Sequence, residues 1–61
     1  MENIMIIPFT RAIVNHHYHG EITVELATEA TYNMNRPHYY SIDFPEWGVF
    51  DLDDLDLVKE I

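Results

Sequence analysis

Large apolar side chains alternate with aspartates over the last fourteen residues, GVFDLDDLDLVKEI. The apolar members are Phe50, Leu52, Leu55 and Leu57, and the acidic members are Asp51, Asp53, Asp54 and Asp56. A period of two is typical of a β-strand that turns one row of side chains toward a core and the other toward water. The segment therefore predicts β-structure and a strongly negative surface on one side of the domain.

The chain has room for one small domain. A chain of 61 residues buries only about 60% of the surface that its unfolded form exposes. Its apolar content of 48%, which includes eight aromatic residues, is nevertheless too high for a disordered chain. There is no cysteine to form a disulfide or a thiolate metal site. We therefore expect a single folded domain over residues 1–61. A second copy of the chain could complete its hydrophobic core.

The clearest strand signal outside this segment is the alternation of Ile22, Val24 and Leu26 with polar residues. Further strands are predicted at residues 9–14 (with a shorter prelude at 4–7), 38–44, 49–52 and 56–61, with one helical turn at 53–55. Turn-forming residues predict a hairpin loop at 15–20, a long loop at 28–37 and a tight turn at 45–48. The alternative is a helix over 21–33, against which the β-branched residues of that segment argue.

The order of motifs in the second half resembles a known fold. A strand ending in "DF", a Trp-Gly turn, the strand "VFDL" and then "DDLDLV" are similar to the closing half of SH3-like barrels, in which a short 3₁₀ turn precedes the last strand. The resemblance covers residues 38–59. It implies an all-β fold, a small SH3-like barrel or roll of about five short strands, and no particular activity. In style the chain also resembles small acidic accessory proteins of phages and mobile elements.

The net charge of −8 constrains the partners. Residues 43–61 contain seven acids and one lysine, so −6 of the charge lies in this segment. For a compact domain of roughly 27 Å, eight charges correspond to about one per 3 Å, against one per 1.7 Å along duplex DNA. This density disfavours direct binding of nucleic acid and favours a protein partner with a basic surface.

Two aromatic residues are predicted to anchor such a partner. Tyr40 is in phase with Ile42 and Phe44 and is assigned to the core, whereas Tyr39 is expected to face outward. Trp47 lies in a turn, where it either caps the core or forms an exposed anchor. The predicted binding site combines these anchors with an acidic rim: Tyr39, Trp47, Asp43, Glu46, Asp51, Asp53, Asp54 and Asp56.

No metal or other cofactor is expected. An EF-hand that began at Asp51 would require glycine at position six, where Asp56 stands. On a strand, Asp51 and Asp53 would lie about 6.7 Å apart on one face, which suits a row of surface charges. The histidines at positions 16, 17 and 19, with His38 as a fourth candidate, have no preorganised ligand spacing. The loop that carries them is interpreted as polar, with a pH-responsive contact as the alternative.

Catalysis and export find little support in the sequence. Ser41 is an isolated hydroxyl, and there is neither a thiol nor a glycine-rich phosphate loop. The initial segment MENIMIIPF carries Glu2, and its apolar run ends at Pro8, which is unlike a signal peptide or a membrane span. We therefore expect a non-enzymatic protein in the cytoplasm, with no direct contact to a membrane.

Two functional hypotheses follow. The first is an acidic protein-binding domain, in its sharper form an inhibitor that occupies the basic, nucleic-acid-binding surface of a host protein as a DNA mimic. The alternative is a self-associating structural domain whose acidity serves solubility. Such a domain would form a homodimer through a strand edge or through Phe9, Tyr39 and Trp47.

Overall fold

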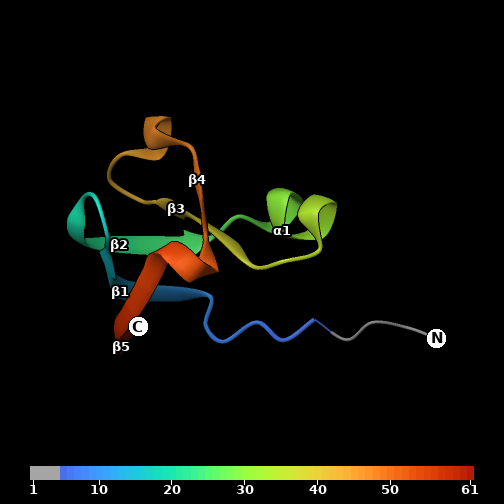
Figure 1. The fold of residues 1–61 in the computed structure, drawn as a ribbon, viewed down its shortest axis with the longest axis horizontal. Helices are drawn as coiled ribbons and strands as arrows, with labels where there is room; N and C mark the ends of the chain where they lie inside the picture. Colours follow the sequence, from blue (N-terminus) through green and yellow to red (C-terminus); the bar gives the residue numbers. More distant parts are fainter. Residues whose placement is uncertain (1–4) are drawn as a thin grey trace.

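The computed structural model describes residues 5–61, which form one curved antiparallel sheet with a short helix beside it (Figure 1). The strands are β1 (Arg11–His16), β2 (Gly20–Leu26), β3 (His38–Ser41), β4 (Val49–Asp51) and β5 (Leu55–Glu60). Their order in the sheet is β4-β3-β2-β1-β5. Residue 4 of the predicted strand prelude lies outside the described residues, and residues 5–7 are not in a strand. The predicted β architecture is confirmed in part: the domain has five antiparallel strands in one sheet, but it is mostly β rather than all-β because a helix is present.

The β1–β2 hairpin follows the sequence prediction closely. His16 pairs with Gly20, which leaves His17, Tyr18 and His19 as the turn. Gly20 has φ 80, a conformation that glycine adopts without steric cost. β1 begins and ends two residues later than expected, so His16 belongs to the strand rather than to the loop.

The predicted loop over residues 28–37 is wrong, because α1 occupies Thr28–Met34. The alternative helix over 21–33 is also wrong in extent, since its first half is strand β2. The helix is fixed by a tertiary contact: the Thr31 hydroxyl oxygen is buried and accepts the N–H of His38 at 2.9 Å. Asn35 ends the helix with a left-handed φ of 56. This contact outweighs the modest helix propensity of threonine.

The core lies on the inner face of the sheet, and Tyr39 is at its centre. Its buried members are Phe9, Ala12, Val14, Val24, Tyr39, Phe50 and Leu55. The Tyr39 ring stacks on Phe9, and its hydroxyl donates to the Phe9 carbonyl at 2.6 Å. The prediction that Tyr40 is core and Tyr39 faces outward is therefore wrong. β3 ends at Ser41, so the assumed continuous phase with Ile42 and Phe44 does not exist, and both of these side chains are exposed.

A 3₁₀ turn, η2 (Leu52–Asp54), joins β4 to β5, close to the helical turn predicted at residues 53–55. These two strands form opposite edges of the sheet. Four residue steps from Asp51 to Leu55 span at most about 14 Å, whereas four strand spacings across a flat sheet cover about 19 Å. The sheet must therefore curl, but it remains open, and closure into a barrel is not observed in the described residues.

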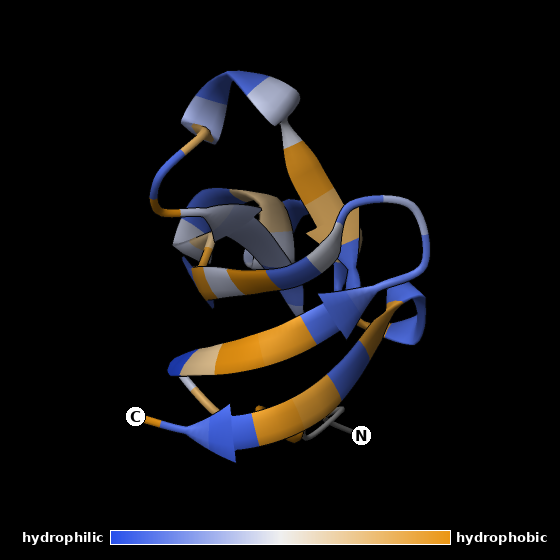
Figure 2. Ribbon diagram, turned by 90° about the vertical axis from the view of Figure 1, so that its left-hand side faces the viewer, coloured by the Kyte–Doolittle hydropathy of each residue, from blue (hydrophilic) through white to orange (hydrophobic). Residues whose placement is uncertain are grey.

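The apolar row predicted for the C-terminal segment is only partly buried. Leu55 lies in the core, but Leu57 is 52% exposed because β5 is an edge strand with a bulge in its pairing to β1. The apolar centre of β5 is visible at the margin of the sheet beside the C-terminus (Figure 2). In the part of the chain that is described, no helix has the length and apolar character required to cross a membrane.

Candidate functional site

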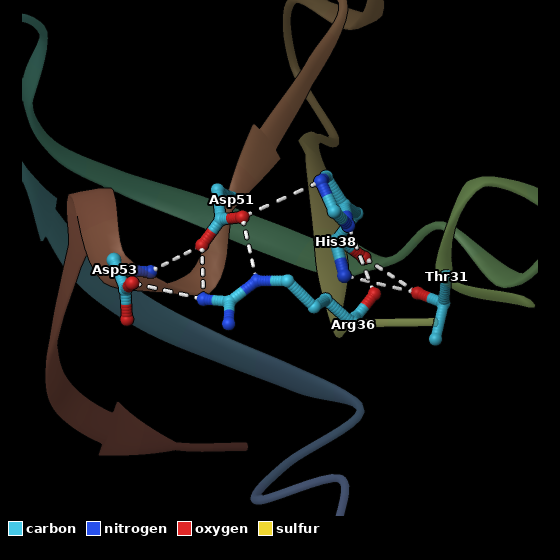
Figure 3. Close-up of polar contacts among 5 residues, drawn as sticks. All are labelled: Thr31, Arg36, His38, Asp51 and Asp53. Atoms are coloured by element: carbon cyan, nitrogen blue, oxygen red, sulfur yellow. Dashed lines mark hydrogen bonds and ion pairs between the residues drawn. The ribbon is translucent and has the colours of Figure 1, made fainter. Parts of the chain in front are cut away.

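Two of the predicted site aspartates converge on one arginine (Figure 3). Arg36 donates from Nε to Asp51 Oδ2 at 3.0 Å and from Nη2 to Asp51 Oδ1 at 2.9 Å. The same Nη2 donates to Asp53 Oδ2 at 2.8 Å. The prediction of a solvated row with the two carboxylates about 6.7 Å apart is therefore wrong. Asp51 begins η2, where its Oδ1 accepts the Asp53 N–H, so the chain turns and brings both carboxylates together.

The bidentate contact between Arg36 and Asp51 favours the ionised form of the Asp51 carboxyl group. Hydrogen bonding from Arg36 lowers the pKa of Asp51 to about 2, and the backbone N–H of Asp53 acts in the same direction. In return, Asp51 raises the pKa of Arg36, with a further contribution from the Asp53 charge. Paired charges of this kind are geometrically specific. One cation thus compensates half of the charge of the two carboxylates, and this part of the acidic segment is committed to internal contacts.

His38 connects these carboxylates to the helix. Its imidazole is buried, and Nδ1 lies 2.8 Å from the Arg36 carbonyl oxygen. A carbonyl can only accept, so Nδ1 carries the proton, while Nε2 lies 3.6 Å from Asp51 Oδ2. Together with the Thr31 contacts, these bonds tie α1, β3, β4 and η2 into one unit (Figure 3). We call Thr31, Arg36, His38, Asp51 and Asp53 the Arg36 network.

A second group of side chains lies at the β1–β2 turn. Trp47, from the 3₁₀ turn η1 (Pro45–Trp47), stacks on His19 with ring centroids 3.8 Å apart and planes 3° from parallel. Phe44 stacks on the same indole at 4.6 Å and 19°. We call His19, Phe44 and Trp47 the aromatic stack. Trp47 is 38% exposed and Phe44 46%, so the indole both packs within the domain and reaches the surface.

Four acidic residues lie next to the aromatic stack in the chain or close to the histidines of the β1–β2 turn, and we call them the acidic rim: Asp43, Glu46, Asp54 and Asp56. The first two are exposed neighbours of Phe44 and Trp47 in the chain. The negative charge of Asp54 acts to raise the pKa of His16, and Asp56 Oδ2 lies 3.8 Å from His17 Nε2. Among residues 5–61, Asp43, Glu46 and Asp54 make no ion pair. Two of the six predicted acids, Asp43 and Glu46, thus lie beside the aromatic stack in the chain, and two more, Asp54 and Asp56, lie near the histidines of the adjoining turn.

The remaining predicted site residues lie elsewhere. Tyr39 is buried in the core and is not accessible to a partner in this fold. Asp51 and Asp53 belong to the Arg36 network. Sequence reasoning also missed His19 and Tyr18; the Tyr18 ring is 86% exposed and meets His19 edge-on at 5.0 Å. The dense aromatic and imidazole content of the turn NHHYHG was the available signal.

The structure assigns other roles to the residues considered for chemistry. The Ser41 hydroxyl oxygen accepts the N–H of Phe44 at 3.0 Å and so holds the chain that carries the aromatic stack. In the described part of the chain, no three His, Asp or Glu side chains converge as metal ligands. Two open grooves of about 310 and 440 Å³ adjoin the junction of β2 and α1. Neither groove is lined by a residue of the aromatic stack.

Comparisons with protein-family models, with curated proteins and with solved structures found no match for this chain. The geometry of the aromatic stack and of the acidic rim is therefore the basis on which a function can be argued.

Proposed function

We propose that this protein is a non-enzymatic binding domain that recognises a basic protein surface with the aromatic stack and the acidic rim. The observation that carries the proposal is the exposure of Trp47 and Phe44 next to Asp43 and Glu46, two acids that have no ion pair among the described residues. Exposed apolar groups inside a polar rim are typical of interaction sites. Tryptophan is also among the residues that dominate binding energy at interfaces.

The distribution of cations supports the choice of partner. Arg11 Nη2 lies 3.3 Å from Glu25 Oε1, and Arg36 is bound by Asp51 and Asp53. Two of the three basic residues in the sequence are therefore already paired with carboxylates. The acidic rim retains its charge, and lysines or arginines of a partner would complement it and steer association.

In its sharper form, the proposal is an inhibitor that covers a nucleic-acid-binding surface. Residues 43–61 carry a net −6, and the whole chain approaches the charge density of a nucleic acid within a factor of about two. A partner that normally binds phosphates would present the matching cations. Exposed charge pairs are screened over about 10 Å at 0.1 M salt, so binding should weaken as salt is added.

We also propose that the curled sheet is related to small SH3-like rolls. The support is the 3₁₀ turn η2 before the last strand and the return of β5 to pair with β1. The short link between the two edge strands requires the strong curvature of such folds.

The test is capture of a partner from lysate by the tagged protein at about 50 mM salt, where screening is weak. The variant Asp43→Asn/Glu46→Gln should lose the captured protein. The control Glu29→Gln/Glu60→Gln removes the same charge from α1 and from the end of β5 and should retain it. Duplex DNA should displace the protein from its partner if the inhibitor proposal is correct. Equal loss in both variants, or binding that does not respond to salt, would contradict the proposal.

A second function, self-association, is favoured by the open edge of β5. Leu57 and Val58 are 52% and 51% exposed on this edge strand. An antiparallel pairing that places Leu57 opposite Val58 of a second copy also places Asp56 opposite Lys59. Apolar contacts flanked by opposite charges stabilise cross-strand pairs.

Sedimentation velocity distinguishes this second function from the first. Lys59→Glu should reduce dimer formation, and the double change Asp56→Lys/Lys59→Glu should restore it with the net charge of the original chain. A monomer at all concentrations, or a dimer that is indifferent to both changes, would exclude this pairing.

A further inference from the structure

His16 holds the β1–β2 turn through a single ring nitrogen. Its Nδ1 lies 2.9 Å from the backbone N of Tyr18 and 3.1 Å from that of His19. Both backbone groups are donors, so Nδ1 must accept and cannot carry a proton. This side chain is therefore a neutral imidazole with its proton on Nε2 in the structure described.

The same ring lies beneath the aromatic stack. It packs on Phe50 with centroids 4.5 Å apart and on His19 at 4.8 Å. Phe50 is buried in the core and belongs to β4, so its contact holds the imidazole in place. His19 contacts both rings, with its centroid 5.7 Å from that of Phe50, and in turn stacks on Trp47 at 3.8 Å. The position of the exposed indole thus depends on His16 through one intervening ring and one backbone hydrogen bond.

We propose that His16 is the positioning residue of the binding surface: as a neutral imidazole it fixes His19 against Trp47, and uptake of a proton dismantles this arrangement. A proton on Nδ1 would place three N–H groups against one another and would remove both hydrogen bonds of the turn. The consequence for partner binding depends on the proposed function, whereas the change in the turn does not. The domain would then bind its partner at neutral pH and release it in mildly acidic conditions.

Charged and titratable groups face His16 from three segments of the chain. His17, Tyr18 and His19 lie in the turn, Asp54 lies on η2, and Asp56 of β5 reaches the site through His17. Burial lowers the pKa of His16 below its ordinary value of 6.5, the positive charges of His19 and His17 act in the same direction, and Asp54 opposes them. The folded state therefore binds a proton less readily than the unfolded chain. The contribution of His16 to the stability of the folded state is therefore fully present above pH 6.5 and is lost as the pH drops toward the lowered pKa.

The test compares His16→Asn with the original protein between about pH 7.5 and 4.5, on either side of an ordinary histidine pKa. Asparagine can place an acceptor oxygen near the position of Nδ1 but does not titrate in this range. On acidification of the original protein, the amide protons of Tyr18 and His19 should lose their hydrogen-bonded chemical shifts, and their protection factors, which correct for the intrinsic pH dependence of exchange, should fall. In His16→Asn the protection factors of both amides should stay constant.

Two further variants keep the result interpretable. His16→Ala should lose both hydrogen bonds at every pH, which shows what the disassembled turn looks like. His17→Asn removes the weakest of the influences that lower the pKa of His16, so the pH transition should persist and shift only slightly toward higher pH. Fluorescence of Trp47, the sole tryptophan, reports the stack in the same samples. Identical pH profiles for the original protein and His16→Asn would overturn the proposal.

Capture of the partner at pH 7.5 and 5.5 separates this inference from the proposed function. Release at the lower pH by the original protein, but not by His16→Asn, supports both. An amide transition with no partner at either pH would refute the proposed function and leave the role of His16 intact. Capture that is equal at both pH values in both proteins would refute the role of His16 and leave the proposed function intact.

Discussion

The two ends of this small sheet contain the same residue types and use them in opposite ways. In the Arg36 network, the Nδ1 of His38 donates to a carbonyl and nearby aspartates are bound by Arg36. At the β1–β2 turn, the Nδ1 of His16 accepts from the backbone, and the acidic rim has no arginine or lysine beside it among residues 5–61. The difference is one internal cation. Asp51 and Asp53 meet this cation and are bonded within the fold, whereas Asp43, Glu46 and Asp54 make no ion pair among residues 5–61.

The most severe test of this comparison removes the link between α1 and β3. Thr31→Val deletes a buried hydroxyl and leaves the N–H of His38 without its acceptor. We expect a loss of about 2 kcal/mol in the free energy of unfolding, measured by urea denaturation. The exposed Thr28→Val, at the start of the same helix, is the control and should change stability far less. An unchanged stability in Thr31→Val would show that this end is not held by the contact.

Removal of the cation should change the response to acid. In Arg36→Gln, the pKa of Asp51 should rise from about 2 toward its ordinary 3.8. The original protein gains stability from ionised Asp51 above pH 3.8 and loses it as the pH falls toward 2, and this dependence should diminish in the variant. A carboxyl-detected NMR titration measures the pKa directly. A value that remains low would mean that the Asp53 N–H, rather than Arg36, controls Asp51.

Neutralising the acidic rim should have little effect on the fold. For Asp43→Asn/Glu46→Gln we expect a free energy of unfolding within about 0.5 kcal/mol of the original value, because both side chains are exposed and make no ion pair among the described residues. Urea denaturation at low and high salt provides the measurement. A large loss of stability would show that these two acids, like Asp51, make contacts that stabilise the fold.

The smallest effect is expected at Asp56, the rim residue whose carboxylate lies against His17. Nε2 of His17 lies 3.8 Å from Asp56, and both side chains are largely exposed. Exposed pairs of this kind contribute little, so His17→Asn should leave the melting temperature unchanged at pH 6 and at pH 8. A clear drop confined to the lower pH would show that the pair contributes to stability when His17 is charged.

Local patterns predicted the elements whose contacts are local. The alternation around Val24 predicted β2, and the glycine at position 20 predicted the hairpin. Predictions failed where a residue distant in the sequence decides the outcome. Thr31 lies in a helix that a hydrogen bond from His38 holds in place, and Tyr39 rather than Tyr40 enters the core because it packs on Phe9, far away in the chain.

The candidate site shows the same difference between local patterns and contacts of residues that are distant in the sequence. The sequence placed acids beside Trp47, since Asp43 and Glu46 are its close neighbours in the chain. It did not show that Arg36, fifteen residues before Asp51, would remove two carboxylates from that surface. Nor did it show that His19 would cross to the indole from another turn.

The three-residue turn η2 also has a consequence for the order of folding. β5 joins the sheet beside β1, so Leu57 must find Val14 across most of the chain. The ordering entropy of such a distant pairing must be overcome before its contacts give any stability, whereas the β1–β2 hairpin closes locally. We therefore expect the hairpin and its stack of rings to form early and the C-terminal strand to dock last. A chain interrupted before that step would present the open backbone edge of β1, which β5 covers in the complete domain.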